Sequence, residues 1–171
     1  MTPRVVLVGV PGSGKSTVGG VLAERLGVAL RDTDRDIEVV AGKPIPDIFI
    51  DDGEPAFRAL ERTAVAAAIA EHDGVLALGG GAVTDAGTRA LLADQPTVWL
   101  AVSAAGGAKR VGLDVPRPVL LGNVRGRLAV LVAERSPLYA EVATVTVETD
   151  GRTPDEVAAV IVAALGLEAV S

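Results

Sequence analysis

A glycine-rich turn between a short apolar run and a helical pattern is the feature that most constrains how this chain can fold. Residues 9–16 read Gly-Val-Pro-Gly-Ser-Gly-Lys-Ser and fit the pattern G-x-x-x-x-G-K-[ST]. The apolar, valine-rich run at residues 4–8 before it is typical of a strand buried on both faces. After it, Val18, Leu22 and Leu26 recur at helical spacing. A strand, a phosphate-binding turn and a helix in this order predict the opening unit of an α/β domain.

The chemistry of this turn follows from its residue types. Glycines let successive backbone N–H groups face a phosphate, and the N-terminus of the following helix adds partial positive charge. Lys15 is expected to reach the β- and γ-phosphates, and Ser16 to offer its hydroxyl to Mg²⁺. The alternative is a plain glycine turn with an incidental lysine, and chance rarely produces this spacing. The turn predicts a nucleoside triphosphate site and leaves the acceptor open.

Strand and helix patterns alternate along the rest of the chain. Further strands are predicted near residues 28–30, 75–78, 97–102 and 144–148, and helices near 37–42, 53–72, 84–92, 103–110, 125–134 and 154–165. Residues 112–123 show little periodicity and are predicted to form a mobile surface loop. We therefore expect residues 1–171 to form a single α/β domain with a mainly parallel sheet.

Composition excludes several classes of chemistry. The chain has no cysteine and one histidine, His72, so disulfides, thiolate sites and most histidine catalysis are excluded. A net charge of −6 argues against nonspecific nucleic-acid or anionic-membrane binding. With no signal peptide or long apolar segment, we expect a cytoplasmic protein without nucleic-acid or membrane partners. Residues 104–135 are the exception, with six basic against two acidic side chains, and suit anionic substrates.

Two carboxylates follow the second predicted strand. Asp32 and Asp34 would point the same way if the backbone there is extended. One could hold Mg²⁺ through water, and the other could take the proton of an acceptor hydroxyl. The alternative is helix N-capping by Asp34 or Asp36.

A run of glycines follows the strand predicted at residues 75–78. Gly79, Gly80 and Gly81 suit a backbone that approaches a ligand closely, and a loose turn is the alternative. On the helix predicted over residues 53–72, Arg58 has an ordinary explanation as an exposed charge paired with Glu54 or Glu61.

Taken together, these motifs closely resemble the shikimate kinases over residues 4–160. The resemblance implies a three-layer α/β/α P-loop kinase fold of the nucleoside-monophosphate-kinase type, with a central parallel sheet and a mobile lid. It also implies transfer of the γ-phosphate of ATP to the 3-hydroxyl of shikimate, on the route to chorismate and aromatic amino acids, by a monomer. The matching segments are residues 9–16, Asp32-Thr33-Asp34, Gly53-Glu54, Phe57-Arg58, Glu61, Leu78-Gly79-Gly80-Gly81-Ala82, Arg117-Pro118 and Glu134-Arg135-Ser136-Pro137-Leu138-Tyr139.

The resemblance also implies roles for individual residues. Mg²⁺ would be bound by Ser16 and, through water, by Asp32, and the catalytic residues would be Lys15, Asp34 and Arg117. Shikimate would be held within residues 32–62 and by a set of side chains and amides: Asp34, Arg58, Gly79, Gly80, Gly81 and Arg135. ATP would contact Gly12, Ser13, Gly14, Lys15, Ser16, Thr17, Arg110, Arg117, Arg152 and Pro154, under a lid at about residues 112–124.

Two other function classes remain open. Another small-molecule kinase, such as a gluconate or nucleotide kinase, would share the phosphate-binding turn. A non-catalytic nucleotide-binding module would not need Asp34, Arg58 and Arg135 together. Phe49 and Phe57 fall in the segment expected to hold the substrate, where they line its pocket or belong only to the core.

Overall fold

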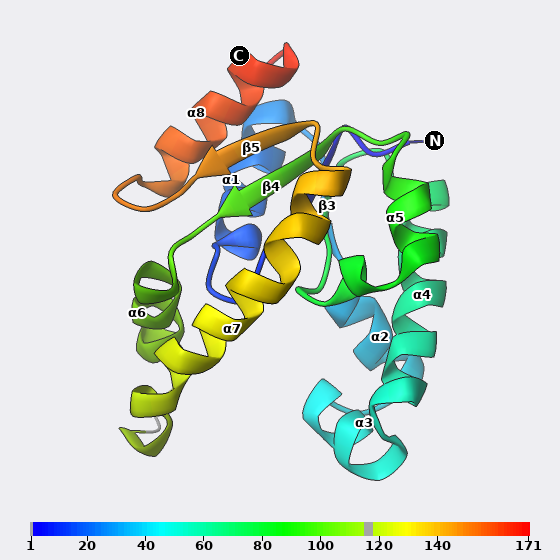
Figure 1. The fold of residues 1–171 in the computed structure, drawn as a ribbon. Coiled ribbons are helices and arrows are strands. Elements are labelled where there is room, and N and C mark those ends of the chain that lie inside the picture. The colour runs from blue at the N-terminus through cyan, green and yellow to red at the C-terminus, as the bar shows by residue number, and fades with distance from the viewer. Residues whose placement is uncertain (1, 115–117) are drawn as a thin grey trace.

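A parallel β-sheet forms the centre of the molecule (Figure 1). The computed structural model describes residues 2–114 and 118–171, with side chains except over 111–114 and 118–123. In that part of the chain the sheet has five strands in the order β2-β3-β1-β4-β5, and every neighbouring pair is parallel. The strands are β1 (Val5–Val8), β2 (Leu30–Asp32), β3 (Val75–Ala77), β4 (Thr97–Ala101) and β5 (Val145–Glu148).

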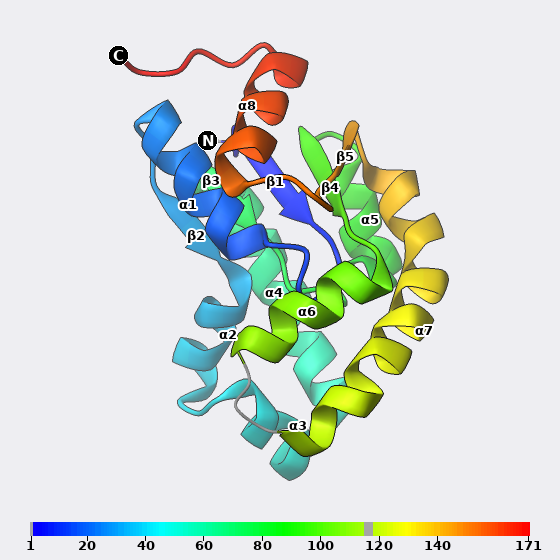
Figure 2. The ribbon, with the colours of Figure 1, turned by 90° about the vertical axis from the view of Figure 1, so that its left-hand side faces the viewer.

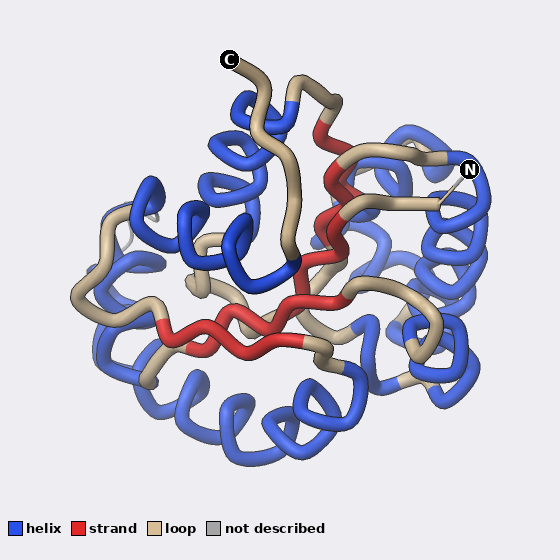
Figure 3. The backbone as a smooth tube through the Cα atoms, turned by 90° about the horizontal axis from the view of Figure 1, so that it is seen from above, coloured by secondary structure: helices blue, strands red, loops and turns tan. Residues whose placement is uncertain are grey.

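Helices cover both faces of the sheet (Figure 3). α1 and α8 pack on one face, and α4, α5 and α7 on the other, so the expected three-layer α/β/α architecture is confirmed. The helices are α1 (Lys15–Leu26), α2 (Thr33–Ala41), α3 (Ile45–Asp52), α4 (Glu54–Glu71), α5 (Ala86–Leu92), α6 (Ala104–Asp114), α7 (Pro118–Val142) and α8 (Pro154–Leu165). Among these described helices, none combines the length and apolar character needed to cross a membrane.

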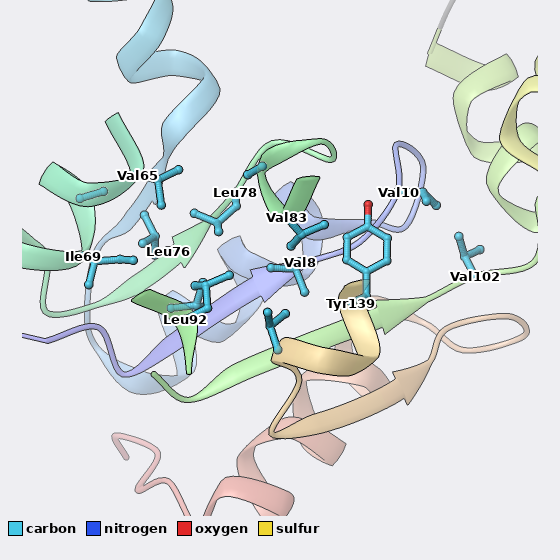
Figure 4. Packing of buried hydrophobic residues seen from close by; sticks show 14 of the residues in the cluster. Val8, Val10, Val65, Ile69, Leu76, Leu78, Val83, Leu92, Val102 and Tyr139 are labelled. Carbon is cyan, nitrogen blue, oxygen red and sulfur yellow. The ribbon is translucent and has the colours of Figure 1, made fainter. Parts of the chain in front are cut away.

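β1 lies at the centre of two hydrophobic cores. Its alternate residues face opposite sides, as the two-residue repeat of a strand requires. Val5 and Leu7 pack with α1 and α8, whereas Val6 and Val8 pack with α4, α5 and α7 (Figure 4). All four side chains are at most 1% exposed. Full burial of such side chains stabilises the fold by about 1.5–3 kcal/mol each, so the strand before the glycine-rich turn is firmly held.

A smaller core holds α2, α3 and α4 together. Its buried members are Ile37, Ile48 and Phe57, one from each helix. Phe57 is therefore a core residue, and the partly exposed Phe49 ring packs against it with centroids 4.6 Å apart. α3 was not predicted from the sequence, because its eight residues are too few to show a helical repeat. In Figure 1, α2 and α3 project below the sheet on the right, opposite α6 and the start of α7 on the left, and Figure 2 views the molecule from the α6 side.

The prediction of a loop over residues 112–123 is wrong at both ends. α6 continues through Asp114, and α7 begins at Pro118, where a proline without an N–H group is well suited. α7 also extends beyond the predicted 125–134 to Val142, through Pro137. Apolar residues on several sides of α7 hide its periodicity in the sequence. Its packing against α6 and the sheet supports its length.

The helix predicted from residue 84 begins two residues later. Residues Ala82–Thr84 form a 3₁₀ turn, and α5 starts at Ala86. Asp85 caps α5, since its carboxylate accepts a hydrogen bond from the Thr88 amide at 2.8 Å. Ser103 caps α6, since its hydroxyl accepts the Gly106 amide at 3.0 Å, and Thr153 caps α8 with Pro154 in the first turn.

Candidate active site

The glycine-rich turn wraps around its own lysine. It joins β1 to α1, and Gly12 and Gly14 have φ angles of 83° and 92°, which side chains other than glycine rarely adopt. The Lys15 Nζ donates to the Gly9 carbonyl at 2.7 Å and to the Val10 carbonyl at 3.1 Å. Burial lowers the pKa of Lys15 to about 8, against the opposing effect of Asp34 and Asp32. The turn therefore holds one cation at its centre.

A cleft of about 440 Å³ opens beside this turn, beyond the carboxyl ends of β1, β2 and β3. Ligands in open α/β sheets bind at this edge. The cleft brings together residues that the sequence predicted from separate segments, namely Gly12, Gly14, Lys15, Ser16, Thr17, Asp32, Asp34, Gly80 and Arg110. Pro11, Ala77 and Leu78 also line it and were not predicted.

Asp32 and Asp34 stand in different local structures. Asp32 ends β2 and caps α2, because its Oδ1 accepts the Asp34 amide at 2.9 Å. Asp34 lies in the first turn of α2, so the premise of extended backbone at both positions was wrong. The alternative of helix N-capping was right about the cap and wrong about the residue, because Asp32 caps α2 and neither Asp34 nor Asp36 does. Burial, with the nearby charges of Asp32 and Glu61, raises the pKa of Asp34 to about 6 despite Lys15.

The three glycines after β3 are in close contact with charged side chains. None has a left-handed φ, so close approach is what requires glycine here. A Cβ on Gly79 would lie 2.5 Å from Asp34 Oδ1, and one on Gly80 would lie 3.3 Å from Arg135 Nη1. A Cβ on Gly81 would overlap the Arg58 guanidinium. The backbone of this loop therefore meets a carboxylate and two guanidinium groups, which would have to shift to make room for a side chain.

Arg58 is held by a buried carboxylate on its own helix. Its Nη1 donates to Glu61 Oε1 at 2.8 Å, and its Nε lies 3.5 Å from Glu54 Oε1. The predicted ion pairs of Arg58 with Glu54 and Glu61 therefore form. The guanidinium of Arg58 also lies close to Gly81. Burial raises the pKa of Glu61, and Arg58 opposes that shift. Glu61 was not predicted as a site residue, although a charged residue among the buried positions of α4 is a usable signal.

A second, smaller pocket of about 130 Å³ adjoins the first on the side of β5. Arg110 lines both pockets and joins their walls, since its Nη1 donates to the Ser13 carbonyl and the Thr149 Oγ1, both at 3.0 Å. Thr149 was missed by sequence reasoning, although it directly follows a strand at the ligand-binding edge. The predicted residues that line this pocket are Ser13, Gly14, Thr17, Arg110, Arg152 and Pro154.

The sequence also predicted a role for Arg117 and a Mg²⁺ site. Arg117 lies outside the described residues. For Mg²⁺, Ser16 and Asp32 both line the larger cleft and offer hydroxyl and carboxylate oxygens, which are the ligands Mg²⁺ prefers. The described residues contain no cluster of three or more potential metal ligands.

Comparison with known proteins identifies the family. The family model for shikimate kinase matches residues 11–166. The chain belongs to the shikimate kinase family. A shikimate kinase of Saccharopolyspora erythraea is 61% identical over 156 residues, which are 91% of this chain and 89% of that protein. A shikimate kinase of Thermobifida fusca is 58% identical over 93% of this chain and 92% of its own length.

A solved shikimate kinase shares the fold closely. The enzyme from Acinetobacter baumannii, determined in complex with shikimate, is 38% identical and superposes with a TM-score of 0.86. The match covers 95% of this chain and 92% of that one. The expected family and the P-loop kinase fold are thus confirmed, and the chain is an ATP-dependent kinase. A non-catalytic nucleotide-binding module is not supported.

Proposed function

We propose that this shikimate kinase transfers the γ-phosphate of ATP to the 3-hydroxyl of shikimate, giving shikimate 3-phosphate. The observation that carries the proposal is one cleft in which the phosphate-binding turn faces Asp34 and a glycine loop backed by two arginines. The solved relative in complex with shikimate supports this acceptor.

Recognition of the acceptor falls to the side of the cleft nearer β2. Arg58 and Arg135 clamp the shikimate carboxylate, because a guanidinium matches a carboxylate in shape and charge. Gly79, Gly80 and Gly81 form the loop beside them, and Gly80 and Gly81 present their backbone amides there, whereas the Gly79 amide donates to Thr33 Oγ1. Asp34 binds the acceptor hydroxyls and takes the proton of the 3-hydroxyl at its carboxylate as the phosphoryl group arrives.

The nucleotide occupies the opposite side of the cleft. Lys15 contacts the β- and γ-phosphates, with Gly12, Ser13, Gly14, Ser16 and Thr17 around them. Arg110 and Arg152, together with Pro154, flank the adenine in the smaller pocket. Arg117 covers the phosphates as part of the lid at about residues 112–124. Closure of that lid excludes water, which otherwise competes as acceptor.

Mg²⁺ is the cofactor of this reaction in our proposal. Ser16 would bind it directly and Asp32 through water, a ligand set that suits the two oxygens at the cleft wall. When bound, the ion neutralises phosphate charge that develops during transfer. The remaining charge comes from Lys15 and Arg117.

A coupled ADP-release assay tests the acceptor. We expect ADP release with shikimate and none with gluconate or nucleoside monophosphates, and loss of turnover when Mg²⁺ is chelated. Preference for gluconate or a nucleotide would replace the proposed acceptor. ATP binding without turnover on any acceptor would point to a nucleotide-binding module.

The arginine clamp is tested by substitution. Arg58→Ala should raise the KM for shikimate and leave the KM for ATP near its original value. An increase confined to the KM for ATP would reassign Arg58 to the nucleotide.

The cellular setting completes the proposal. We propose a cytoplasmic monomer that needs neither a nucleic acid nor a membrane. Sedimentation of the purified protein with and without both substrates tests the oligomeric state, and a stable dimer would overturn it.

A further inference from the structure

Tyr139 is a buried aromatic residue that carries a polar group to the edge of the active site. It lies on α7 and is 1% exposed, with its ring in the apolar cluster between the sheet and α7 (Figure 4). The Trp99 ring packs against it with centroids 5.7 Å apart. Burial raises the pKa of Tyr139 to about 12, so its hydroxyl keeps its proton and remains a donor.

The hydroxyl of Tyr139 donates to the Gly80 carbonyl at 2.5 Å. That carbonyl belongs to the peptide group that joins Gly80 to Gly81. In a trans peptide the C=O and N–H groups point in opposite directions within one plane. Fixing the Gly80 carbonyl therefore also fixes the direction of the Gly81 N–H.

The other two carbonyls of the glycine loop accept hydrogen bonds from the 3₁₀ turn that follows: Gly79 from the Ala82 amide and Gly81 from the Thr84 amide, both at 3.1 Å. The Gly80 carbonyl is held by Tyr139 instead. Glycine loses more backbone freedom on folding than any other residue and has no side chain to anchor it. From the other side, Thr33 Oγ1 on α2 accepts the Gly79 amide at 3.3 Å. Among the described residues, the amides of Gly80 and Gly81 donate to no other protein group, and Gly80 lines the larger cleft.

α7 presents a charge and a donor to the same loop. Arg135 precedes Tyr139 by four residues, which places both on one face of a helix. Arg135 Nη1 lies 3.3 Å from the position of a Cβ on Gly80. One helix face thus sets both the guanidinium and the backbone amides beside it.

We infer that Tyr139 is a positioning residue, whose hydroxyl orients the Gly80–Gly81 peptide so that the Gly81 N–H of this peptide meets the carboxylate of the acceptor. The inference rests on the proposed function for the identity of the acceptor. Tyr139 does not touch the acceptor itself and acts through the backbone of the loop.

Kinetics of Tyr139→Phe test this role. The substitution keeps the ring and its packing and removes only the hydroxyl, so we expect the KM for shikimate to rise about tenfold. The KM for ATP should change less than twofold. Thr97→Val is the matched control, because Thr97 has a fully buried hydroxyl that donates to the Gln95 carbonyl at 3.3 Å, at the start of β4 and away from the cleft. Thr97→Val should lower the Tm without changing either KM.

A second measurement needs no substitution. Tyr139 is the only tyrosine in the sequence, so protein grown with [¹³Cζ]tyrosine gives one signal from the carbon that bears the hydroxyl. Saturating shikimate should shift this signal. An unshifted signal would overturn the inference, even if Tyr139→Phe failed to fold.

The kinetic results distinguish the role of Tyr139 from the proposed function of the protein. Wild-type turnover on shikimate with an unchanged KM in Tyr139→Phe overturns the role of Tyr139 alone. Equal increases in both KM values would show a merely structural role and also overturn it. A wild-type protein that releases no ADP with shikimate overturns the proposed function and this inference with it.

Discussion

Arg58 Nη1 lies 2.8 Å from Glu61 Oε1, and Glu61 is 3% exposed. The buried carboxylate therefore holds the guanidinium that we assign to the acceptor. We expect Glu61→Gln to raise the KM for shikimate roughly tenfold, since a hydrogen bond between charged groups is replaced by a weaker one. Steady-state kinetics with each substrate varied in turn measures this.

Glu54→Gln is the matched control for that substitution. Glu54 approaches the same guanidinium at 3.5 Å, but its side chain is 64% exposed. Exposed ion pairs contribute little, so its KM for shikimate should stay near the wild-type value. Equal effects of the two substitutions would contradict a special role for Glu61.

Gly79 has no room for a side chain. A Cβ there would lie 2.5 Å from Asp34 Oδ1 and 2.9 Å from Glu61 Oε2, so Gly79→Ala should displace both carboxylates. We expect kcat/KM for shikimate to fall about 100-fold, as small displacements of catalytic groups can cause. Gly20→Ala on α1 is the control, because a Cβ there meets nothing within 4 Å. It should stabilise the protein by about 0.5–1 kcal/mol with activity unchanged. Loss of activity in both variants would contradict a specific steric effect at Gly79.

Asp34 should destabilise the protein when no ligand is present. Its pKa is raised from 3.8 to about 6, so the folded state binds its proton more tightly than the unfolded state does. The free energy of unfolding contributed by this group therefore falls as pH rises from about 4 to 6. Asp34→Asn should remove that fall and stabilise the protein at pH 7 by about 1–3 kcal/mol.

Denaturant unfolding without Mg²⁺ and nucleotide, at several pH values, measures this effect. The same variant should lose turnover, because Asn cannot accept the proton of the acceptor. Asp36→Asn is the control, since Asp36 is paired with Arg31 at 2.7 Å, and it should give no stabilisation. Stabilisation by both substitutions would disprove the assignment to Asp34.

Arg117→Ala should lower kcat much more than it weakens ATP binding. The reason is that, in our proposal, Arg117 neutralises charge that develops on the transferred group. Arg127→Ala, which removes an exposed charge from α7, serves as the control. Pre-steady-state rates and nucleotide titrations separate the two effects, and an unchanged kcat would refute the role of Arg117.

Local signals in the sequence were enough to predict most of the fold. β1 and β4 are short apolar runs, and α8 opens with a proline inside a capping box, so each element could be recognised from a few neighbouring residues. α3 and the C-terminal end of α7 could not, because packing rather than periodicity stabilises them. An eight-residue helix held by the burial of Ile48 gives no local signal of that packing.

The residues of the candidate site also divide into those with a local signal in the sequence and those placed by packing. Lys15 and Ser16 were predictable because the phosphate-binding turn is one continuous segment. Arg58 and Arg135 were assigned through their resemblance to family motifs. Tyr139 was not assigned, because its contact with Gly80 joins residues 59 positions apart in the sequence. Such a contact is set by the packing of α7 over the sheet, and no spacing rule contains it.

The strand order has a consequence for how acceptor choice can diverge. Most residues that we assign to the acceptor side follow β2 and β3, with Arg135 of α7 as the exception, and Arg110 and Thr149 on the proposed nucleotide side follow β4 and β5. β1 lies between the two halves and carries the phosphate-binding turn. Apart from Arg135, the two proposed recognition surfaces therefore lie at opposite edges of one sheet and can change separately. A chimera that exchanges only residues 33–62 with those of another P-loop kinase should alter the acceptor while the nucleotide preference is retained.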